Sequence, residues 1–284
     1  MGPAPTRRAA EALRSAEAFK ELERTGWAEK AETYGLLTGR ITARLVEPLL
    51  DAAGVAAGTR VLDVGTGPGY AAEQATRRGA LATGVDIADE LVALARRRHR
   101  GIRFLQADAE DLPFAERSFD ALVSNFTINH LPRPEQAIRE FARVVAPRGG
   151  IALSAWDRPE RNRFLGILVD ALRASGVTRP PEAAAGPDPY RFANDNELRG
   201  LLHIAGLESV EIRSVSLTHL VADADALWEG MLGGSVRTAG LIMRQPPATR
   251  TRVRAAVERL ADEHRVDGAL AIPACAKIAR GRRP

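Results

Sequence analysis

The sequence contains a single cysteine, Cys275, among its 284 residues. One cysteine excludes an internal disulfide, and its position in an apolar run near the C-terminus indicates a small buried core residue. No apolar run approaches the ~18–20 residues that cross a bilayer. Residues 1–22 are charged and alanine-rich, without the apolar stretch of a signal peptide. These absences predict a cytoplasmic protein without membrane insertion.

Lysine and aromatic residues are also scarce: Lys20, Lys30 and Lys277 are the only lysines, and aromatics make up 5% of the chain. The net charge is +4, but the arginines that supply it are spread through the chain and interleaved with acids. Two basic clusters, at 96–100 and 280–283, do not alternate with aromatic residues as a nucleic-acid stacking surface would. We therefore expect a solvated basic surface and no nucleic-acid partner.

Metal-binding patterns are missing as well. The five histidines are scattered, without a His-x-x-x-His spacing or a cysteine partner, so we expect no metal site. A Gly-x-x-x-x-Gly-Lys phosphate loop is absent too.

The first part of the chain has a helical pattern. Ala9 to Leu22 is typical of an amphipathic helix, Trp27 to Leu37 of a second helix, and Ile41 to Ala53 of a third that ends at Gly54. From Arg60 onward, short apolar segments alternate with helical ones.

That alternation predicts a parallel sheet with right-handed crossovers. Glycines or prolines separate most of the segments, and the C-terminal part is less regular. The predicted strands are Arg60–Val64, Leu81–Val85, Ile102–Gln106, Ala121–Ser124, Ile151–Ala155, Val210–Leu217 and Ala269–Ala279, and the predicted helices include 89–98, 134–145 and 194–205.

Two segments fit poorly into a regular α/β pattern, and we expect both to cover the site. The expected organisation is an N-terminal helical cap over 1–56, a ligand-binding core over 57–156, lid and substrate-binding insertions over 157–193 and 219–266, and the rest of the core over 194–218 and 267–284.

Polar residues and glycines follow the predicted strands. An open parallel sheet binds its ligand beyond the carboxyl ends of its strands, where the strand order reverses. Glycines at 65, 67 and 69 let the backbone approach a ligand closely, and an acid such as Asp86 after the second strand can hold both hydroxyls of a ribose. NAD proteins and S-adenosylmethionine proteins share these two features.

Three details favour S-adenosylmethionine. Tyr70 occupies the third conserved position of the dinucleotide fingerprint, where glycine or alanine is required. Asp63 suits the ammonium end of S-adenosylmethionine, whereas it would repel a pyrophosphate. Asp108 is placed to accept a hydrogen bond from an adenine amino group, with the Ala109 amide beside it. A nicotinamide-dependent oxidoreductase is therefore a weaker alternative.

The chain resembles the class I methyltransferases, specifically the small-molecule branch that includes enzymes of ubiquinone and menaquinone biosynthesis. The resemblance covers about Val61 to Asp157 and is specific as a set. Its motifs are Leu62-Asp63-Val64-Gly65-Thr66-Gly67-Pro68-Gly69, Gly84-Val85-Asp86, Ala107-Asp108-Ala109, Leu112-Pro113-Phe114, Ser118-Phe119-Asp120 and Arg143-Val144-Val145-Ala146-Pro147-Arg148-Gly149-Gly150.

The resemblance implies a doubly wound, Rossmann-like, seven-stranded α/β sheet with strand order 3-2-1-4-5-7-6 and strand seven antiparallel. It also implies S-adenosylmethionine as cofactor and S-adenosylhomocysteine as product. The implied cofactor-binding residues are Asp63, Gly65, Gly67 and Gly69 at the methionine end, Asp86 at the ribose, Asp108 and Ala109 at adenine, and Asn125 beside the methyl group. Ile87, next to Asp86, is a further expected cofactor contact. Tyr34 lies seven residues after Trp27 on a helix expected to fold over the cofactor, so we expect its hydroxyl to contact the ligand; ordinary packing is the alternative role.

His130 is the best candidate for a general base, because it follows the fourth strand on the catalytic edge; ordering of the loop before Pro132 is the alternative role. A base is needed only if the methyl acceptor must lose a proton. The cover segments should supply a mainly apolar acceptor pocket. Its expected contacts are Trp156, Asn162, Tyr190 and Trp228.

The expected function is methyl transfer to a small, apolar or aromatic metabolite on O, N or C, as in secondary or quinone metabolism. A non-catalytic S-adenosylmethionine-binding scaffold protein is the alternative from a different class. The sequence leaves the identity of the acceptor and the oligomeric state open, with a homodimer among the arrangements allowed.

Overall fold

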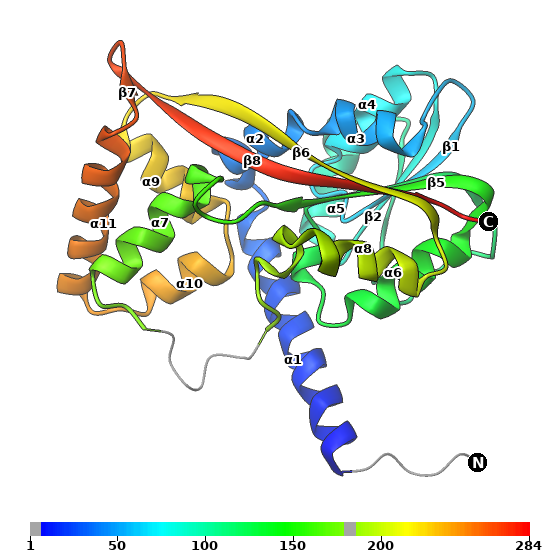
Figure 1. Cartoon of the computed structure of the whole chain (residues 1–284), viewed down its shortest axis with the longest axis horizontal. Coiled ribbons are helices and arrows are strands. Elements are labelled where there is room, and N and C mark those ends of the chain that lie inside the picture. Colours follow the sequence, from blue (N-terminus) through cyan, green and yellow to red (C-terminus); the bar gives the residue numbers. More distant parts are fainter. Residues whose placement is uncertain (1–6, 179–185) are drawn as a thin grey trace.

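The structure, a computed structural model, describes residues 7–178 and 186–284. Its centre is one twisted sheet with helices on both faces (Figure 1). The strands are β1 (Arg60–Val64), β2 (Leu81–Asp86), β3 (Arg103–Gln106), β4 (Phe119–Asn125), β5 (Val145–Trp156), β6 (Glu208–Val221), β7 (Arg265–Val266) and β8 (Ala269–Arg282).

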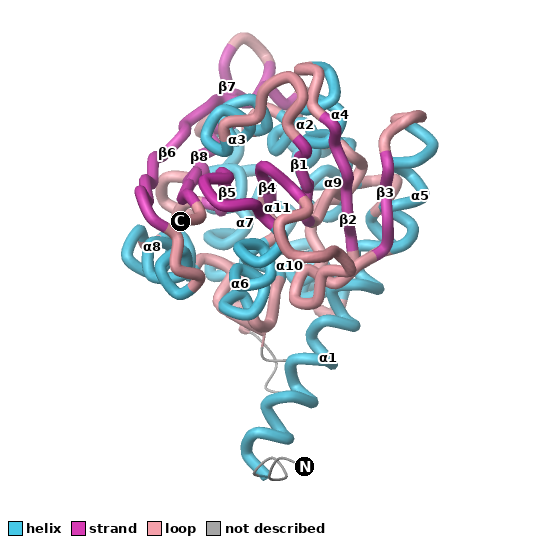
Figure 2. The backbone as a smooth tube through the Cα atoms, turned by 90° about the vertical axis from the view of Figure 1, so that its right-hand side faces the viewer, coloured by secondary structure: helices cyan, strands magenta, loops and turns pink. Residues whose placement is uncertain are grey.

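The sheet has the order β3-β2-β1-β4-β5-β8-β6, and Figure 2 shows the strands side by side in this order. Strands β1 to β5 pair in parallel, whereas β8 is antiparallel to both β5 and β6. The predicted order is confirmed, with β8 in the place of the seventh strand. The two-residue β7 pairs only with β8 and forms a short hairpin.

The helices pack as two layers on the sheet and as a separate group beside it. Helices α3 and α4 share one buried cluster with β1, β4 and β5, and α6 and α8 share another on the opposite face. The α-helices are α1 (Arg7–Lys30), α2 (Thr38–Ala43), α3 (Val46–Ala53), α4 (Tyr70–Arg77), α5 (Asp89–Arg98), α6 (Pro134–Val144), α7 (Arg163–Ala174), α8 (Asp195–Ile204), α9 (Ala224–Gly233), α10 (Arg237–Met243) and α11 (Pro247–Asp262), and the 3₁₀ turns are η1 (Tyr34–Leu36), η2 (Ile128–His130) and η3 (Arg191–Ala193).

Strands β6 and β8 continue beyond the sheet as a two-stranded arm. Residues 276–282 of β8 pair with β5 as well as with β6, but residues 270–275 pair with β6 alone among the long strands. Pro273 lies in this arm, which explains how proline is tolerated in a long strand. The arm reaches helices α7, α9, α10 and α11, which form a group at the left of Figure 1.

The N-terminal helices differ from the sequence-based prediction. We expected a break between helices at 9–22 and 27–37, but α1 runs without interruption from Arg7 to Lys30. Gly26 lies within it, where a Cβ atom would come within 2.2 Å of a Val236 side-chain carbon. This glycine therefore serves close packing against the residue before α10 rather than helix termination.

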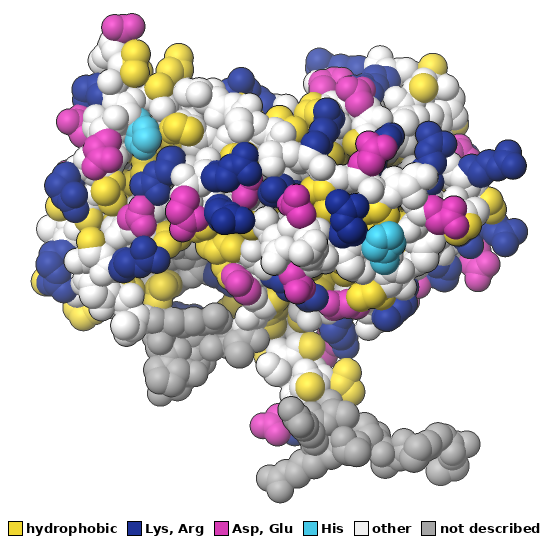
Figure 3. Space-filling model, viewed as in Figure 1, with side chains coloured by type: hydrophobic (Ala, Val, Ile, Leu, Met, Phe, Trp, Pro, Cys, Tyr) yellow, Lys and Arg dark blue, Asp and Glu magenta, His cyan; other side chains and the backbone are white. Residues whose placement is uncertain are grey.

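Three findings bear on the expectations from composition. Within the described ranges, none of the helices combines the length and apolarity that a bilayer crossing demands. On the face seen in Figure 3, basic and acidic side chains lie interspersed. The single cysteine, Cys275, is buried in β8, as predicted.

Candidate functional site

The turn between β1 and α4 places backbone at the carboxyl edge of the sheet. Gly65, Gly67 and Gly69 all have positive φ, at 70°, 52° and 90°, a region that favours glycine. A Cβ on Gly65 would meet Thr127 Oγ1 at 1.9 Å, whereas a Cβ on Gly67 would meet nothing within 4 Å. Gly67 therefore borders open space, into which a ligand can come close to the backbone.

Gly69 serves close packing within the turn. A Cβ there would lie 2.7 Å from the His99 ring and 3.1 Å from Phe104. The residue is the N-cap of α4 and permits close packing of the turn against α5 and β3. Among the described residues it lines neither the cavity nor the recess beside it, and its cofactor contact stays a prediction.

Asp63 is a buried carboxylate at the end of β1, with 1% of its surface exposed. Its Oδ2 accepts hydrogen bonds from Thr66 Oγ1 at 2.6 Å and from the Ala72 amide at 3.0 Å. Its Oδ1 is buried and has no hydrogen-bond partner among the described residues. Burial raises the pKa of Asp63 to about 6, although both hydrogen bonds oppose the shift.

Asp63 borders a small recess beside the glycine turn. The recess is also lined by Tyr34, Thr42, Gly67 and Asn125, with Gly65, Thr66, Pro68, Tyr70 and Ala71 completing it. A buried carboxylate oxygen without a donor is costly. A cationic ligand group in this recess would satisfy it.

Asp86 ends β2 and is held by the backbone on both sides. Its Oδ2 accepts from the Gly67 amide at 2.9 Å and its Oδ1 from the Ala88 amide at 3.0 Å. Burial raises its pKa, and the backbone hydrogen bonds oppose that shift. The carboxylate and its neighbour Ile87 line the main cavity, and their cofactor-binding role stays a prediction.

Asp108, after β3, is ion-paired with a residue that the sequence did not single out. Lys20 of α1 lies 2.5 Å from Asp108 Oδ2 and 2.8 Å from the buried Glu110. The other oxygen, Oδ1, accepts from the Glu110 amide at 2.9 Å. Asp108 and Ala109 line the cavity. The ion pair of Lys20 therefore holds α1 against the segment that follows β3.

Asn125 and Tyr34 complete the predicted cofactor set. Asn125 ends β4, donates to the Thr42 carbonyl at 3.2 Å and accepts from Ser154 Oγ at 2.7 Å. Tyr34 lies in η1 and shares a 2.9 Å hydrogen bond with Thr42 Oγ1. Burial raises its pKa, so the phenol is a neutral wall of the site. Both residues border the cavity and the recess.

The main cavity has a volume of about 850 Å³ and extends from the strand ends to the cover helices. This is near the upper end of the range for small-molecule sites, about 300–1,000 Å³. Its far part is mainly apolar and comes from β5, α7 and α10. The lining residues there include Trp156, Phe164, Leu165, Leu168, Val169, Leu172 and Leu241.

The four predicted acceptor contacts divide into two pairs. Trp156, stacked on Phe126 at 3.9 Å between ring centroids, and Tyr190 both line the cavity. Burial raises the pKa of Tyr190 to about 12.

Asn162 and Trp228 do not line the cavity in the described part of the chain, and the structure does not bring them together with the other two. Asn162 is fully buried at the start of α7, where its carbonyl accepts the first amides of the helix. Trp228 lies on α9 and packs against the core shared with α11 and η1.

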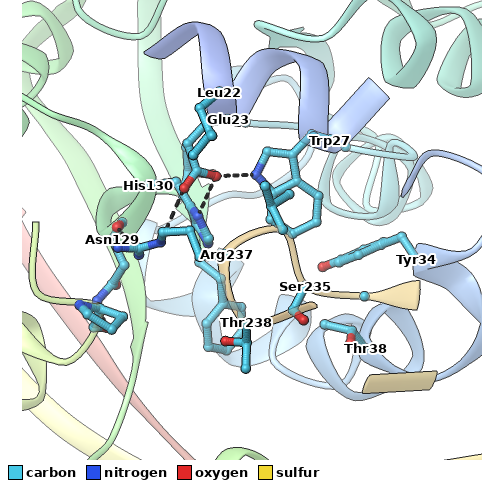
Figure 4. Close-up of a pocket in the computed structure, with 18 of the residues that line it drawn as sticks. Leu22, Glu23, Trp27, Tyr34, Thr38, Asn129, His130, Ser235, Arg237 and Thr238 are labelled. Carbon is cyan, nitrogen blue, oxygen red and sulfur yellow. Dashed lines mark hydrogen bonds and ion pairs between the residues drawn. The ribbon is translucent and has the colours of Figure 1, made fainter. Parts of the chain in front are cut away.

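Helix α1 roofs the cavity, and one polar group lies at its centre. Glu23 contacts Trp27, His130 and Arg237, as Figure 4 shows. Neither Glu23 nor Arg237 was predicted as a site residue. One signal was available: Glu23 lies four residues from both Phe19 and Trp27, so it interrupts an apolar stripe of the helix.

The family comparison agrees with this geometry. A family model described as a methyltransferase domain matches residues 62–153. Demethylmenaquinone methyltransferases of Renibacterium salmoninarum and Paenarthrobacter aurescens are 29% and 30% identical over 56% and 53% of this chain. These alignments span 68% and 60% of the relatives' own lengths.

Over its sheet core the chain is therefore similar to the class I S-adenosylmethionine-dependent methyltransferases, with the family model covering residues 62–153. Among solved structures, the chain is similar to the [4+2]-cyclase SpnF, with 24% identity over 85% of this chain and 80% of that one and a TM-score of 0.53. That likeness shows the fold alone, since one fold hosts different chemistries.

The described residues of this chain fit S-adenosylmethionine, the cofactor of that family. The orphaned Oδ1 of Asp63, which borders the recess, suits an ammonium group, and the open space at Gly67 leaves room for a ligand against the turn. Asp86, on the same rim, offers a carboxylate to a diol. The recess at Asp63 and the cavity at Asp86 share Gly65, Gly67 and Asn125 as lining residues, so a carboxylate suited to a cation and one suited to a diol lie on the two sides of the same turn.

Proposed function

We propose that this protein transfers the methyl group of S-adenosylmethionine to a small, largely apolar acceptor. One observation carries the proposal: a single cavity joins the glycine turn and Asp86 to an apolar chamber under the cover helices. A cofactor at the strand ends and an acceptor in the chamber would therefore share one enclosed space.

The cofactor-binding roles follow from the rim. Asp63 and the backbone at Gly65 and Gly67 would hold the methionine end, and Asp86 the ribose hydroxyls. Ile87 and Ala109 would contact the nucleoside, and Asp108 would share its Oδ2 between Lys20 and the adenine amino group. When bound, S-adenosylmethionine supplies an activated methyl group on a sulfonium. Asn125 and Tyr34 lie between the recess and the chamber, where they would border that methyl group.

The chamber supports the acceptor class. Trp156 and Phe164 lie with their ring centroids 5.7 Å apart, and leucines of α7 extend the apolar wall. Two relatives are named demethylmenaquinone methyltransferases, so an aromatic or quinol-type acceptor is the first class to test. Tyr190 supplies one polar contact on this wall.

The enclosure matters for catalysis. Methyl transfer from a sulfonium depends mainly on in-line alignment of the acceptor and on exclusion of water. Helix α1 covers the cavity and is tied to the core by the Lys20–Asp108 and Arg133–Glu17 ion pairs, at 2.5 and 2.6 Å. These contacts would keep bulk water from the reacting atoms.

Calorimetric titration with S-adenosylhomocysteine and, separately, with NAD tests the ligand. Binding of S-adenosylhomocysteine alone is expected; binding of NAD alone would favour the oxidoreductase alternative. Transfer of labelled methyl from S-adenosylmethionine to a panel of phenols and quinols tests turnover. Cofactor binding without turnover on broad acceptor panels would instead support a scaffold protein.

A further inference from the structure

Glu23 is a buried acid on the cavity side of α1. Only 4% of its side chain is exposed, and it lies between Phe19 and Trp27 on one face of the helix. Burial of a carboxylate is costly unless hydrogen bonds and an opposite charge compensate it. Helix stability alone would be better served by an apolar residue, so the acid calls for another explanation.

Each oxygen of this carboxylate has a defined neighbour. Oε2 accepts from Trp27 Nε1 at 2.9 Å and lies 3.0 Å from His130 Nδ1, and Oε1 lies 3.2 Å from Arg237 Nε. Figure 4 shows these three partners converging on Glu23 from α1, η2 and the start of α10. Glu23 therefore connects α1, the η2 turn that carries His130, and the start of α10.

The contact fixes the orientation of His130. A carboxylate can only accept, so the neutral imidazole donates its Nδ1 proton to Glu23 and leaves Nε2 as an acceptor. The Trp27 ring meets the imidazole edge-on, with centroids 5.2 Å apart and an angle of 83° between planes. Since His130 lines the cavity, the ring is held at the cavity wall.

Arg237 also contacts the η2 turn that carries His130. It donates to the Asn129 carbonyl at 3.0 Å and to the Pro187 carbonyl at 2.7 Å, and its guanidinium lies 5.4 Å from the centre of the Phe19 ring. Because Asn129 precedes His130, the arginine holds both the histidine's backbone and the carboxylate that orients it.

We propose that Glu23 is a positioning residue that holds His130 as a general base, and that the acceptor therefore carries an ionisable hydroxyl such as a phenol. This inference rests on the proposed methyl transfer and specifies its acceptor. An acceptor that needs no deprotonation would have no use for an oriented histidine.

The step balances without another reactant. The acceptor O–H gives its proton to His130 Nε2, and the oxygen lone pair forms the new C–O bond. The methyl C–S bond breaks and its electron pair stays on sulfur, which becomes a neutral thioether. Glu23 keeps its charge throughout and stabilises the imidazolium that forms.

The experiment compares two acceptors, phenol and 4-nitrophenol, at about pH 8, where only 4-nitrophenol is largely ionised. The variants are Glu23→Gln, His130→Gln and the double variant, with Glu21→Gln as the matched control. Glu21 is on the same helix and lines the same cavity, but its carboxylate binds the exposed Arg24. Calorimetry with S-adenosylhomocysteine checks that each variant is folded.

Removal of a positioned base typically costs about 10²–10⁴ in rate. We expect His130→Gln to slow methyl transfer to phenol by about that factor, and Glu23→Gln by about tenfold to a hundredfold. Both losses should shrink to less than about tenfold with 4-nitrophenol, which needs no base. The double variant should be no slower than His130→Gln alone, because the two residues act as one unit.

Three results would overturn the inference: equal losses on both acceptors, an equal loss in Glu21→Gln, or no wild-type transfer to either phenol despite cofactor binding. Failure of the wild type to bind S-adenosylhomocysteine would instead overturn the proposed function. Should Glu23→Gln fail to fold, the comparison of the two acceptors with His130→Gln decides the role of the base. Trp27→Phe then tests the positioning. It leaves Glu23 and His130 in place, so it should retain the wild-type ratio of the rates on phenol and 4-nitrophenol.

Discussion

Replacing Asp63 with asparagine should stabilise the protein at neutral pH. The substitution keeps one oxygen to accept from Thr66 and from the Ala72 amide. It puts a neutral amide where the wild type has a buried, unpartnered carboxylate oxygen. The variant therefore removes a buried charge while it preserves the shape of the site.

The size of the effect follows from the pKa of Asp63, about 6 in the folded protein against an ordinary 3.8. The folded-state pKa is raised, so ionisation of Asp63 destabilises the fold above about pH 6, and this cost disappears as pH falls toward 3.8. It amounts to about 3 kcal/mol at pH 7.5 and about half of that at pH 5. Loss of this cost is offset in part by the unpartnered amide, which costs about 1–3 kcal/mol.

Urea denaturation of both proteins at pH 7.5 and pH 5 measures the difference. The advantage of Asp63→Asn in free energy of unfolding should shrink by about 1.5 kcal/mol between the two pH values. Carboxylates distant from Asp63 titrate equally in both proteins and cancel, whereas Asp86 interacts with Asp63 and changes with it. A difference that stays constant, or that grows as pH falls, would refute the assignment of a charged, buried Asp63.

Three further predictions concern the rim and the roof. Asp86→Ala should weaken S-adenosylhomocysteine binding by about 1–3 kcal/mol, the scale for hydrogen bonds to a charged group; unchanged affinity by calorimetry would remove Asp86 from the ribose site. Gly69→Ala should lower the free energy of unfolding by about 2–4 kcal/mol, because the added methyl would lie 2.7 Å from a histidine ring. A methyl group at Gly67 would meet no atom within 4 Å, so Gly67→Ala should lower the free energy of unfolding by only about 1 kcal/mol. Equal losses for the two variants in urea denaturation would contradict this difference between the two glycines. Lys20→Met breaks the ion pairs that tie α1 to the rim, so α1 should be cleaved faster in limited proteolysis; unchanged cleavage would show that other contacts hold the roof.

The core of the sheet was predictable because its signals are local. The segment Arg60–Val64 was predicted with the bounds that β1 has, since a short apolar run ends at a glycine turn. Asp86 and Asp108 follow their strands in the same way, and parallel topology brings strand ends together without further information. These positions needed only the sequence pattern and one rule about open sheets.

The position of α1 over the cavity was not predictable, because it depends on contacts between segments that are distant in the sequence. The sequence predicted separate helices at 9–22 and 27–37, yet Gly26 lies within α1, where its lack of a side chain serves a contact with Val236, more than 200 residues away in sequence. Lys20 meets Asp108 only because α1 lies across the cavity. The same long-range packing directs Trp228 toward the core and not into the cavity.

The arm of β6 and β8 shows a third case. We predicted 210–217 as a strand, and β6 runs from 208 to 221, with a register shift between Glu208 and Glu211. β6 is an edge strand that pairs with β8 along its whole length. Of the four residues beyond 217, only Val221 is buried, so the alternation that marks a strand is weak there.

A crystal structure of the complex with S-adenosylhomocysteine is the most direct test of the central claim. We expect the amino group in the recess at Asp63, the ribose hydroxyls on the Asp86 carboxylate and the sulfur facing the apolar chamber that Trp156 lines. A nucleoside bound away from Asp63 and Asp86, or a sulfur directed away from that chamber, would contradict it.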